Sequence, residues 1–416
     1  MAIRNHAFRI AVRQFGPFES AIAKQWAIFD QQRKSGLELE AVPFDLNSLH
    51  ESLFANNGLA KGEWDVAFIS TDWLAEAAER KCLMDLSPRV SELPPAGYPT
   101  AWSHSLLRLQ STNGRIFGLP YHDGPECLIY RRDLFQSPVE RDRFLQIYGT
   151  SLQAPKNWAD FRRIAEFFTR PEQPLYGTVF AAFPDGHNTV YDFCLQLWSR
   201  GGELFDRASH LSLETPVAHT ALDYYRSVLN DCKIVHPQSR TFDSVKSGLA
   251  FASGQVAMMV NWFGFAAMCE TVAESRVKGC VAVAPVPCEG RAGVSLNAYW
   301  ILAIAGGSSH QPLAYDFLVH CASPQMDKLL TLEGGIGCRR STWSDEEVNA
   351  AIPFYRCLEQ LHENARELPA LSHWAKLAEV LDDMVLEALN TPTPTAEILR
   401  RAQARSDEML NTVGSS

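Results

Sequence analysis

The chain has 416 residues, with 38 basic and 48 acidic side chains and a formal net charge of −10 when histidine is neutral. This length predicts two or three domains of about 150 residues each, and a hydrophobic content of 46% is that of an ordinary globular protein. The 23 Phe, 10 Trp and 11 Tyr can bury large cores, which excludes disorder as the dominant state. No basic cluster is dense enough to follow a phosphate backbone, so we expect no nucleic-acid partner.

Two uncharged stretches, 247–269 and 292–315, are long enough to cross a bilayer. Each contains polar or helix-breaking residues, such as Asn261 in the first and Pro312 in the second. We therefore predict a buried strand with flanking turns in each stretch rather than a membrane span. The first fifteen residues lack the apolar core and cleavage site of a secretory signal. This pattern predicts either a cytoplasmic protein or a mature form whose leader has been removed.

The ten cysteines form no CxxC pair. Buried free thiols are expected where cysteines have apolar sequence neighbours, as for Cys82, Cys194, Cys232, Cys269 and Cys321. Cys280 and Cys288 are close enough in sequence to bridge a loop, and the sequence leaves their pairing open.

Strands and helices alternate over the first eighty residues. Apolar runs predict strands at 8–12, 37–42 and 64–69, and helical spacing predicts helices at 21–29, at 49–59 and from Trp73 to Ala78. This alternation indicates an α/β lobe with a largely parallel sheet. Ligand groups in such sheets come from loops that follow strands, a position occupied by segments 13–19 and 70–73.

Three segments are candidates for crossovers between lobes. The segment 118–125 contains two glycines and two prolines, which predicts a poor strand interior. A second candidate lies between Pro285 and Ala298, and a third follows 333–337. Between the crossovers we predict a helix at 157–168 capped by Asn157, a helix with Thr215 as its cap and Pro216 in its first turn, and a buried strand at 256–260. The C-terminal part is predicted to be mostly helical.

Four sequence phrases occur in a fixed order that is similar to a known family. They are Trp64 to Trp73, GRIFGLPYHDGPECLIYRRDLF from Gly114, FASGQVAMMVNWFGF from Phe251 and LAYDFLVHCASPQMDKLL from Leu313. Together they resemble the extracellular solute-binding proteins of ABC importers, in the sugar-binding family that includes maltose-binding protein. Arg131 departs from the family pattern, which usually has Asn there, and the cysteine content is high for an exported protein.

The resemblance implies an α/β, two-lobe periplasmic-binding-protein fold (type II-like) with three crossovers and a ligand cleft between the lobes. It implies an N-terminal lobe of 1–121 plus 296–335, a C-terminal lobe of 123–292 plus 340–416, and crossovers near 120–125, 285–298 and 334–341. By this likeness the protein captures a sugar or other small polyhydroxylated solute by lobe closure at the periplasmic or extracellular face. It then delivers the solute to ABC permease subunits in the membrane. We expect a monomer that is not an enzyme and that uses no cofactor or metal.

A site for such a solute needs charged or amide groups around its hydroxyls and a flat aromatic ring beneath its C–H face. We expect the ligand-binding residues to be Arg13, Phe15, Glu19, Asp72, Tyr121, His122, Asp123, Glu126, Asp185, His187, Asn188, Trp262, Phe263, Asn297, Tyr299, Arg339 and Arg340. Trp262 is the expected stacking platform, with Phe263 as its substitute, and either arginine can bind a hydroxyl pair or a carboxylate bidentately.

Each of these residues also has a purely structural interpretation. Asp72 can cap the helix that follows it, the loop 185–188 can be a solvated turn, and Trp262 can be a core residue. The two arginines can form a salt bridge across the lobe seam. Tyr224-Tyr225 lies within a helix and is interpreted as core packing.

Two other functions stay open at this point. An enzyme on the bilobal scaffold, such as a glycoside hydrolase, can use two carboxylates such as Asp123 and Asp185, although nothing in their spacing selects this chemistry. A cytoplasmic sensor of the same solute class suits the cysteines and the missing signal. His122, Asp123 and Glu126 are a weak metal-binding alternative, because no second histidine falls at helical spacing.

Overall fold

The computed structural model describes residues 6–207, 210–231, 233–290 and 293–413, with the backbone alone for 411–413. Cys232 and residues 291–292, which fall within the second expected crossover, lie outside the described residues. The chain divides into two compact units. Unit 1 contains Met1–Pro125, Asn297–His362 and Glu367–Trp374, and unit 2 contains Glu126–Leu296, Glu363–Arg366 and Ala375–Ser416.

Unit 1 is built on a five-stranded sheet with the order β2-β1-β3-β12-β6. Its strands are β1 (Ala7–Arg13), β2 (Glu38–Phe44), β3 (Val66–Ser70), β12 (Trp300–Ile304) and β6 (Gly118–His122). The first three are mutually parallel, as the alternation of strands and helices predicts, and β12 runs antiparallel to β3 and β6. The five residues of β3 are all buried, so the sheet passes through the core of the unit.

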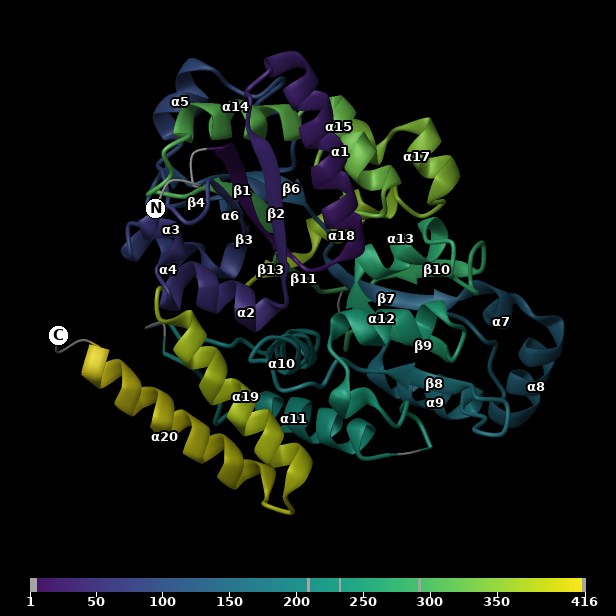
Figure 1. Ribbon diagram of the computed structural model, residues 1–416. Coiled ribbons are helices and arrows are strands. Elements are labelled where there is room, and N and C mark those ends of the chain that lie inside the picture. The colour runs from purple at the N-terminus through teal and green to yellow at the C-terminus, as the bar shows by residue number, and fades with distance from the viewer. Residues whose placement is uncertain (1–5, 208–209, 232, 291–292, 414–416) are drawn as a thin grey trace. The chain divides into compact units, whose positions relative to one another are not determined.

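Helices cover both faces of this sheet. Helices α1 (Gly16–Arg33) and α14 (Gln311–Cys321) contact each other on one face, and α2 (Leu46–His50) contacts β1. Figure 1 shows α14 above the sheet, α1 along its right-hand side and α2 below it. The remaining elements of this unit are a π-helical turn η2 (Glu51–Ala55), α3 (Gly58–Lys61), a 3-10 turn η3 (Thr71–Trp73), α4 (Leu74–Glu79), α5 (Ser87–Glu92), α6 (His104–Leu109), β4 (Ser111–Thr112), β5 (Arg115–Ile116), α15 (Pro324–Leu332), α16 (Arg340–Trp343) and α17 (Glu346–Ala351).

Unit 2 is built on a four-stranded sheet with the order β10-β7-β9-β8. Its strands are β7 (Glu126–Arg131), β8 (Tyr176–Val179), β9 (Val256–Trp262) and β10 (Val281–Ala284). Helix α9 (Trp158–Phe168) contacts β8 and β9, and α13 (Phe263–Thr271) contacts β10 and β7. The other elements here are α7 (Arg132–Gln136), α8 (Pro138–Tyr148), α10 (Asn188–Trp198), α11 (Pro216–Leu229), η4 (Ser239–Thr241), α12 (Ser244–Ala252) and α20 (Thr395–Val413).

Four elements lie where the chain passes from one unit to the other. They are β11 (Ser295–Asn297), α18 (Cys357–Glu363), β13 (Ala365–Glu367) and α19 (Trp374–Asn390).

The predicted helix caps in unit 2 are confirmed. The side chain of Asn157 accepts a hydrogen bond from the Asp160 N–H at the start of α9, and Thr215 does the same for Ala218 at the start of α11. These bonds satisfy N–H groups that the first helical turn leaves without an intrahelical partner.

The prediction that 118–125 makes a poor strand interior is wrong for its first half. Residues Gly118–His122 form β6, which pairs with β12. β6 is the last strand of the sheet, and an edge strand tolerates Pro120 because one of its sides needs no hydrogen-bond donor.

The assignment of residues 340–362 to the second lobe needs correction. The chain stays in unit 1 as far as His362. Helices α16 and α17 contact α15 of the same unit, so the glycine-rich segment 333–337 is not followed by a passage into unit 2. The chain instead enters unit 2 briefly at Glu363–Arg366 and again from Ala375 onward.

None of the described helices is both long and apolar enough to span a bilayer. The first uncharged stretch contains the buried strand β9, as expected, but α12 and α13 flank it rather than turns. Cys280 and Cys288 are free thiols, as are the seven other described cysteines.

Candidate functional site

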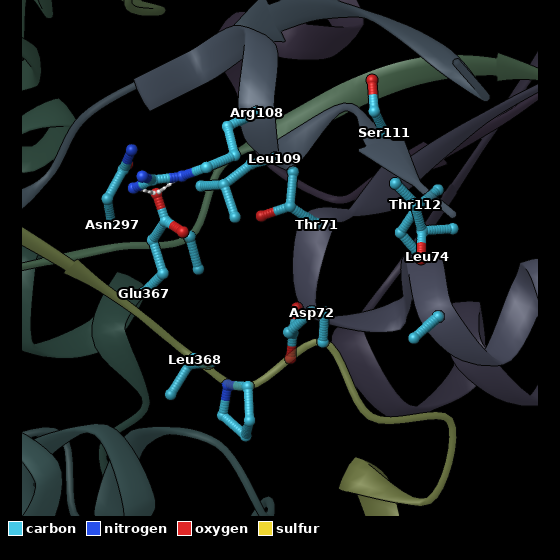
Figure 2. Close-up of a pocket in the computed structure, with 14 residues that line it drawn as sticks. Thr71, Asp72, Leu74, Arg108, Leu109, Ser111, Thr112, Asn297, Glu367 and Leu368 are labelled. Carbon is cyan, nitrogen blue, oxygen red and sulfur yellow. Dashed lines mark hydrogen bonds and ion pairs between the residues drawn. The ribbon is translucent and has the colours of Figure 1, made fainter. Parts of the chain in front are cut away.

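A cavity of about 240 Å³ lies in unit 1, beyond the carboxyl end of β3. Its lining residues come from η3, α4, α6, β4 and two later segments of the chain (Figure 2): Thr71, Asp72, Leu74, Ala75, Arg108, Leu109, Ser111, Thr112, Asn297, Ala298, Glu367, Leu368, Pro369 and Ala370. Two of the predicted ligand-binding residues, Asp72 and Asn297, line this cavity.

Asp72 is held in the turn that follows β3. Its carboxylate accepts a hydrogen bond from the Ser70 hydroxyl, and the residue is 8% exposed. The alternative role as cap of the next helix is wrong, because the N-cap position of α4 is Trp73. The neighbouring Thr71 hydroxyl accepts a hydrogen bond of 3.2 Å from the Tyr299 N–H, which joins the turn to β12.

Asn297 is the most unusual polar residue of the cavity. It is 1% exposed, and neither its side-chain Nδ2 nor its Oδ1 has a hydrogen-bond partner among the described residues. Buried polar atoms are nearly always hydrogen-bonded, and leaving one unsatisfied costs about 1–3 kcal/mol. The amide therefore has a donor and an acceptor that no described residue uses, both of them buried.

We did not predict the ion pair in this cavity. Arg108 on α6 donates through Nε to Glu367 Oε1 at 3.0 Å, and its Nη2 contacts the same oxygen. Figure 2 shows this pair among the lining residues. The partners are 259 positions apart, and neither has a local motif that points to the other. Ser111 and Thr112, which we also did not predict, add hydroxyl groups to the lining.

Two residues of the first expected crossover form hydrogen bonds with other residues of unit 1. The Tyr121 hydroxyl donates to Gln25 Oε1 at 2.9 Å, and burial raises the pKa of Tyr121 well above its usual value. The Nδ1 of His122 accepts a hydrogen bond of 2.9 Å from the Ile336 N–H. Desolvation lowers the pKa of His122 to about 3, so its imidazole is neutral at pH 7.

Asp123 forms a buried pair with a residue that the sequence did not suggest. Its Oδ2 lies 2.6 Å from His362 Nε2, while Oδ1 is buried without a hydrogen-bond partner in the described residues. The Nδ1 of His362 lies 3.0 Å from the Ser105 hydroxyl, and its ring stacks on Trp343 with centroids 5.0 Å apart. Hydrogen bonds thus connect Asp123, His362 and Ser105 within unit 1.

The expected site residues at and after the end of β1 contact neighbouring elements of unit 1. The Arg13 guanidinium donates to the carbonyls of Gln14 and Phe44 at 3.2 and 3.3 Å. Phe15 precedes α1 and packs edge-on against Phe18, with the ring of His122 6.4 Å away. Glu19 lies partly buried in the first turn of α1.

The arginines after the third glycine-rich segment do not line the cavity. Arg339 is 4% exposed, donates at 2.8 Å to the carbonyls of Ala322 and Ala96, and stacks on Trp102. Arg340 begins α16 and is exposed. Tyr299 is also a core residue, because its hydroxyl donates to the Leu106 carbonyl at 2.5 Å.

In unit 2, the loop 185–188 starts a helix. Asp185 Oδ1 accepts hydrogen bonds from the N–H groups of His187 and Asn188 at 3.0 and 2.9 Å, and its other oxygen contacts the Asn188 amide. These bonds lead into the first turn of α10, and Asn188 is buried, so the loop is a hydrogen-bonded turn that is only partly solvated. His187 packs edge-on against Tyr191.

Trp262 ends β9 and is partly exposed. Its ring lies perpendicular to Tyr191, with centroids 5.6 Å apart. Phe263 is fully buried at the start of α13, so it does not offer a free face. Tyr191 was not predicted, because its place on an apolar helix is typical of a core residue.

Two buried acids neighbour this aromatic pair: Asp192 follows Tyr191 in the chain, and Glu126 pairs with Trp262 across the sheet. Glu126 is 5% exposed. Its pKa is raised well above the usual range, mainly by burial and to a lesser extent by the nearby charge of Asp192. Burial raises the pKa of Asp192 to about 7. The hydroxyl of Tyr225 donates to Asp192 at 2.6 Å, so Tyr225 is a core residue as predicted. Tyr224 is partly buried and donates to the Trp158 carbonyl.

Across the described ranges, no three His, Cys, Asp or Glu side chains gather in a way that can hold a metal ion. The weak metal-binding alternative at 122–126 therefore gains no support from the geometry.

Comparison with known proteins identifies a consistent group of relatives. A family model described as bacterial extracellular solute-binding protein matches residues 14–328. A probable ABC transporter-binding protein of Deinococcus radiodurans is 23% identical, over 84% of this chain and 81% of its own length. A mannitol-binding protein of Pseudomonas aeruginosa is 25% identical over 59% of this chain and 55% of its own length.

Solved structures resemble the fold along nearly the whole chain. A solute-binding protein of an Agrobacterium radiobacter ABC transporter, in complex with ribitol, has a TM-score of 0.86 at 21% identity and covers 97% of this chain and 99% of its own. An Agrobacterium vitis counterpart with bound D-mannitol has a TM-score of 0.84 at 18% identity and covers 98% of this chain and 99% of its own. The chain thus has the fold of the two-lobe periplasmic sugar-binding proteins, as expected from its sequence.

Proposed function

The chain belongs to the family of bacterial extracellular solute-binding proteins and acts as the substrate-binding component of an ABC transporter; we propose that its solute is a sugar or polyol. The observation that carries this proposal is the unit 1 cavity, where the Asp72 carboxylate and the unpartnered Asn297 amide line the same space. Hydroxyl groups both donate and accept hydrogen bonds, so a polyhydroxylated solute suits such a lining. Relatives named for mannitol or solved with ribitol support the same solute class.

The oligomeric state, the location and the partners of the protein follow from the same proposal. We propose that the protein works as a monomer at the periplasmic or extracellular face and delivers its solute to permease subunits in the membrane. We further propose that solute binding favours a closed arrangement of the two lobes, because a ligand shifts an equilibrium toward the state it binds better.

Binding without turnover is the favoured activity. The carboxylates of the hydrolase alternative, Asp123 and Asp185, belong to different units. Asp123 is engaged by His362, and Asp185 orders the start of α10. These contacts give each carboxylate a structural partner within its own unit, which favours binding over acid–base chemistry on a glycoside.

Calorimetry against a panel of sugars, polyols and sugar acids tests the proposal. We expect saturable one-to-one binding of at least one neutral member and an unchanged solute after incubation. Thermal shift provides a second readout, since a ligand at one hundred times its Kd stabilises the folded state by about 2.7 kcal/mol. Absence of binding across the panel would contradict the proposed solute class, and product formation would contradict the choice of binding over catalysis.

A further inference from the structure

We propose that the unit 1 cavity is a subsite for two neighbouring hydroxyl groups of the solute, which bind the side-chain Nδ2 and Oδ1 of Asn297. We propose further that this subsite rejects a carboxylate in the same position. This inference rests on the proposed function and adds to it the chemical group that the solute must present.

The first step is the state of the Asn297 amide. Other buried asparagines have partners: Asn261 Nδ2 donates to the Ser244 carbonyl at 3.1 Å, and its Oδ1 accepts from the Trp262 N–H at 2.8 Å. Among the described buried amides, Asn297 alone lacks a partner on both atoms. Because Asn297 also lines a cavity, its missing partners are expected to come from a bound molecule.

The second step is the kind of group that satisfies both atoms. Nδ2 donates and Oδ1 accepts, and a carboxylate offers acceptors alone. A carboxylate therefore satisfies Nδ2 and leaves Oδ1 facing another acceptor, whereas two adjacent hydroxyls satisfy both atoms. A site built to hydrogen-bond a hydroxyl strongly rejects a group that lacks the hydrogen bond, because the buried partner is left unpaired.

The third step concerns the cation of the cavity. Arg108 is the one basic residue among the described lining residues, and its guanidinium already binds Glu367. The arginines expected to bind an acidic solute do not line the cavity: Arg339 is held by two backbone carbonyls and Arg340 is exposed. A solute carboxylate that enters the cavity would therefore compete with Glu367 for the Arg108 guanidinium.

The size of the cavity limits how much of the solute it holds. A volume of about 240 Å³ is smaller than the roughly 300–1,000 Å³ of sites that enclose a whole drug-sized ligand. The subsite is therefore expected to take a small polyol, or one end of a longer chain, where two hydroxyls stand on adjacent carbons.

Paired ligands separate this inference from the proposed function. Calorimetry compares ribitol and D-mannitol with their aldaric acids, in which both ends are carboxylates, so that no alcohol end is left to bind in a reversed orientation. If another neutral member of the panel binds more tightly, it is tested with its own diacid. We expect the neutral compound to bind at least tenfold more tightly than the diacid.

The decisive variant is Asn297→Leu, with Asn47→Leu on the surface of α2 as the matched control in the same unit. We expect Asn297→Leu to weaken neutral polyol binding at least tenfold and to reduce the preference over the diacid to less than threefold. Ligand-free stability should be unchanged or higher, because an unsatisfied buried amide is replaced by an apolar group of similar shape. Asn47→Leu should alter neither affinity nor preference.

Each other outcome overturns the subsite. Equal or tighter binding of the diacid by the wild type rejects the selectivity while the proposed function stands. If Asn297→Leu binds the polyol as tightly as the wild type does, the amide is satisfied by water alone. If the ligand-free variant is less stable than the ligand-free wild type, the amide has a structural role. If no polyhydroxylated compound binds, the proposed function fails and the subsite fails with it.

Discussion

Tyr225 donates a hydrogen bond of 2.6 Å to the carboxylate of Asp192, and both side chains are buried in unit 2. The two residues lie on neighbouring helices, α11 and α10, which contact each other. Burial raises the pKa of Asp192 to about 7, although the bond from Tyr225 acts in the opposite direction. The folded protein therefore holds a proton on Asp192 at a pH where an unfolded chain has released it.

This proton makes stability depend on pH in a defined direction. Between about pH 4 and pH 7 the folded state binds more protons at this site than the unfolded state, so the contribution of Asp192 to the free energy of unfolding falls as pH rises. Urea unfolding at pH 4.5 and pH 7 measures the difference. We expect Asp192→Asn to reduce this fall, whereas Asp142→Asn, on the exposed surface of α8, should leave it unchanged.

His122 is expected to act in the opposite direction over nearly the same range. Desolvation lowers its pKa to about 3, so the unfolded state binds more protons below about pH 6.5 and stability is lost as pH falls. Protonation of Nδ1 also removes the acceptor for the Ile336 N–H.

Urea unfolding between pH 6.5 and pH 4 tests this prediction. We expect His122→Gln to lose less stability over this interval than the wild type does. His104→Gln is the control, because His104 is exposed in the same unit. An imidazole of His122 that titrates near pH 6.5 in the NMR spectrum of the native protein would contradict the assignment.

Trp262 is expected to contribute an aromatic surface to solute binding. It is partly exposed at the end of β9, and its orientation is fixed by the perpendicular contact with Tyr191. We expect Trp262→Ala to weaken binding of the solute found in the panel at least tenfold, about 1.4 kcal/mol, as measured by calorimetry. Phe183→Ala removes an exposed aromatic of the same unit and should have little effect. Unchanged affinity in Trp262→Ala would remove this residue from the site.

Gly177 sets the distance between β8 and α9. A Cβ at this position would lie 1.8 Å from the Ala165 carbonyl oxygen, so Gly177→Ala forces the helix away from the strand. We expect a loss of about 3 kcal/mol or more in the free energy of unfolding, or failure to fold, as measured by urea unfolding. Gly16→Ala is the matched control, since nothing lies within 4 Å of its Cβ position. Equal stability of the two variants would contradict the close approach.

Sequence reasoning succeeded where the deciding forces are local. Helix α9 was predicted from its cap and apolar stripe, because Asn157 and Asp160 are three residues apart and the buried residues follow helical spacing. The end of a strand likewise pointed to Asp72, and the second crossover candidate pointed to Asn297; both residues line one cavity. Their ligand contacts, like those of the other predicted site residues, stay predictions.

It failed where a residue's role depends on distant partners. Pro120 is accommodated because β6 lies at the sheet edge, a property that no window of sequence contains. The glycines at 334–337 suggested a crossover, but a Cβ on Gly337 would lie 2.4 Å from Asp327 Oδ2, so close packing accounts for this glycine. Arg108 and Glu367 are 259 positions apart, and only the folded chain brings them together.

The order of strands in unit 1 has a consequence for synthesis of the protein. β12 lies between β3 and β6 in the sheet. In the sequence, however, β12 (Trp300–Ile304) comes long after β6, which ends at His122. At about 5–20 residues per second on the ribosome, β6 leaves the exit tunnel long before its partner has been translated. The first 125 residues are thus expected to depend on chaperones until the remainder arrives, and genes truncated after them should give insoluble products.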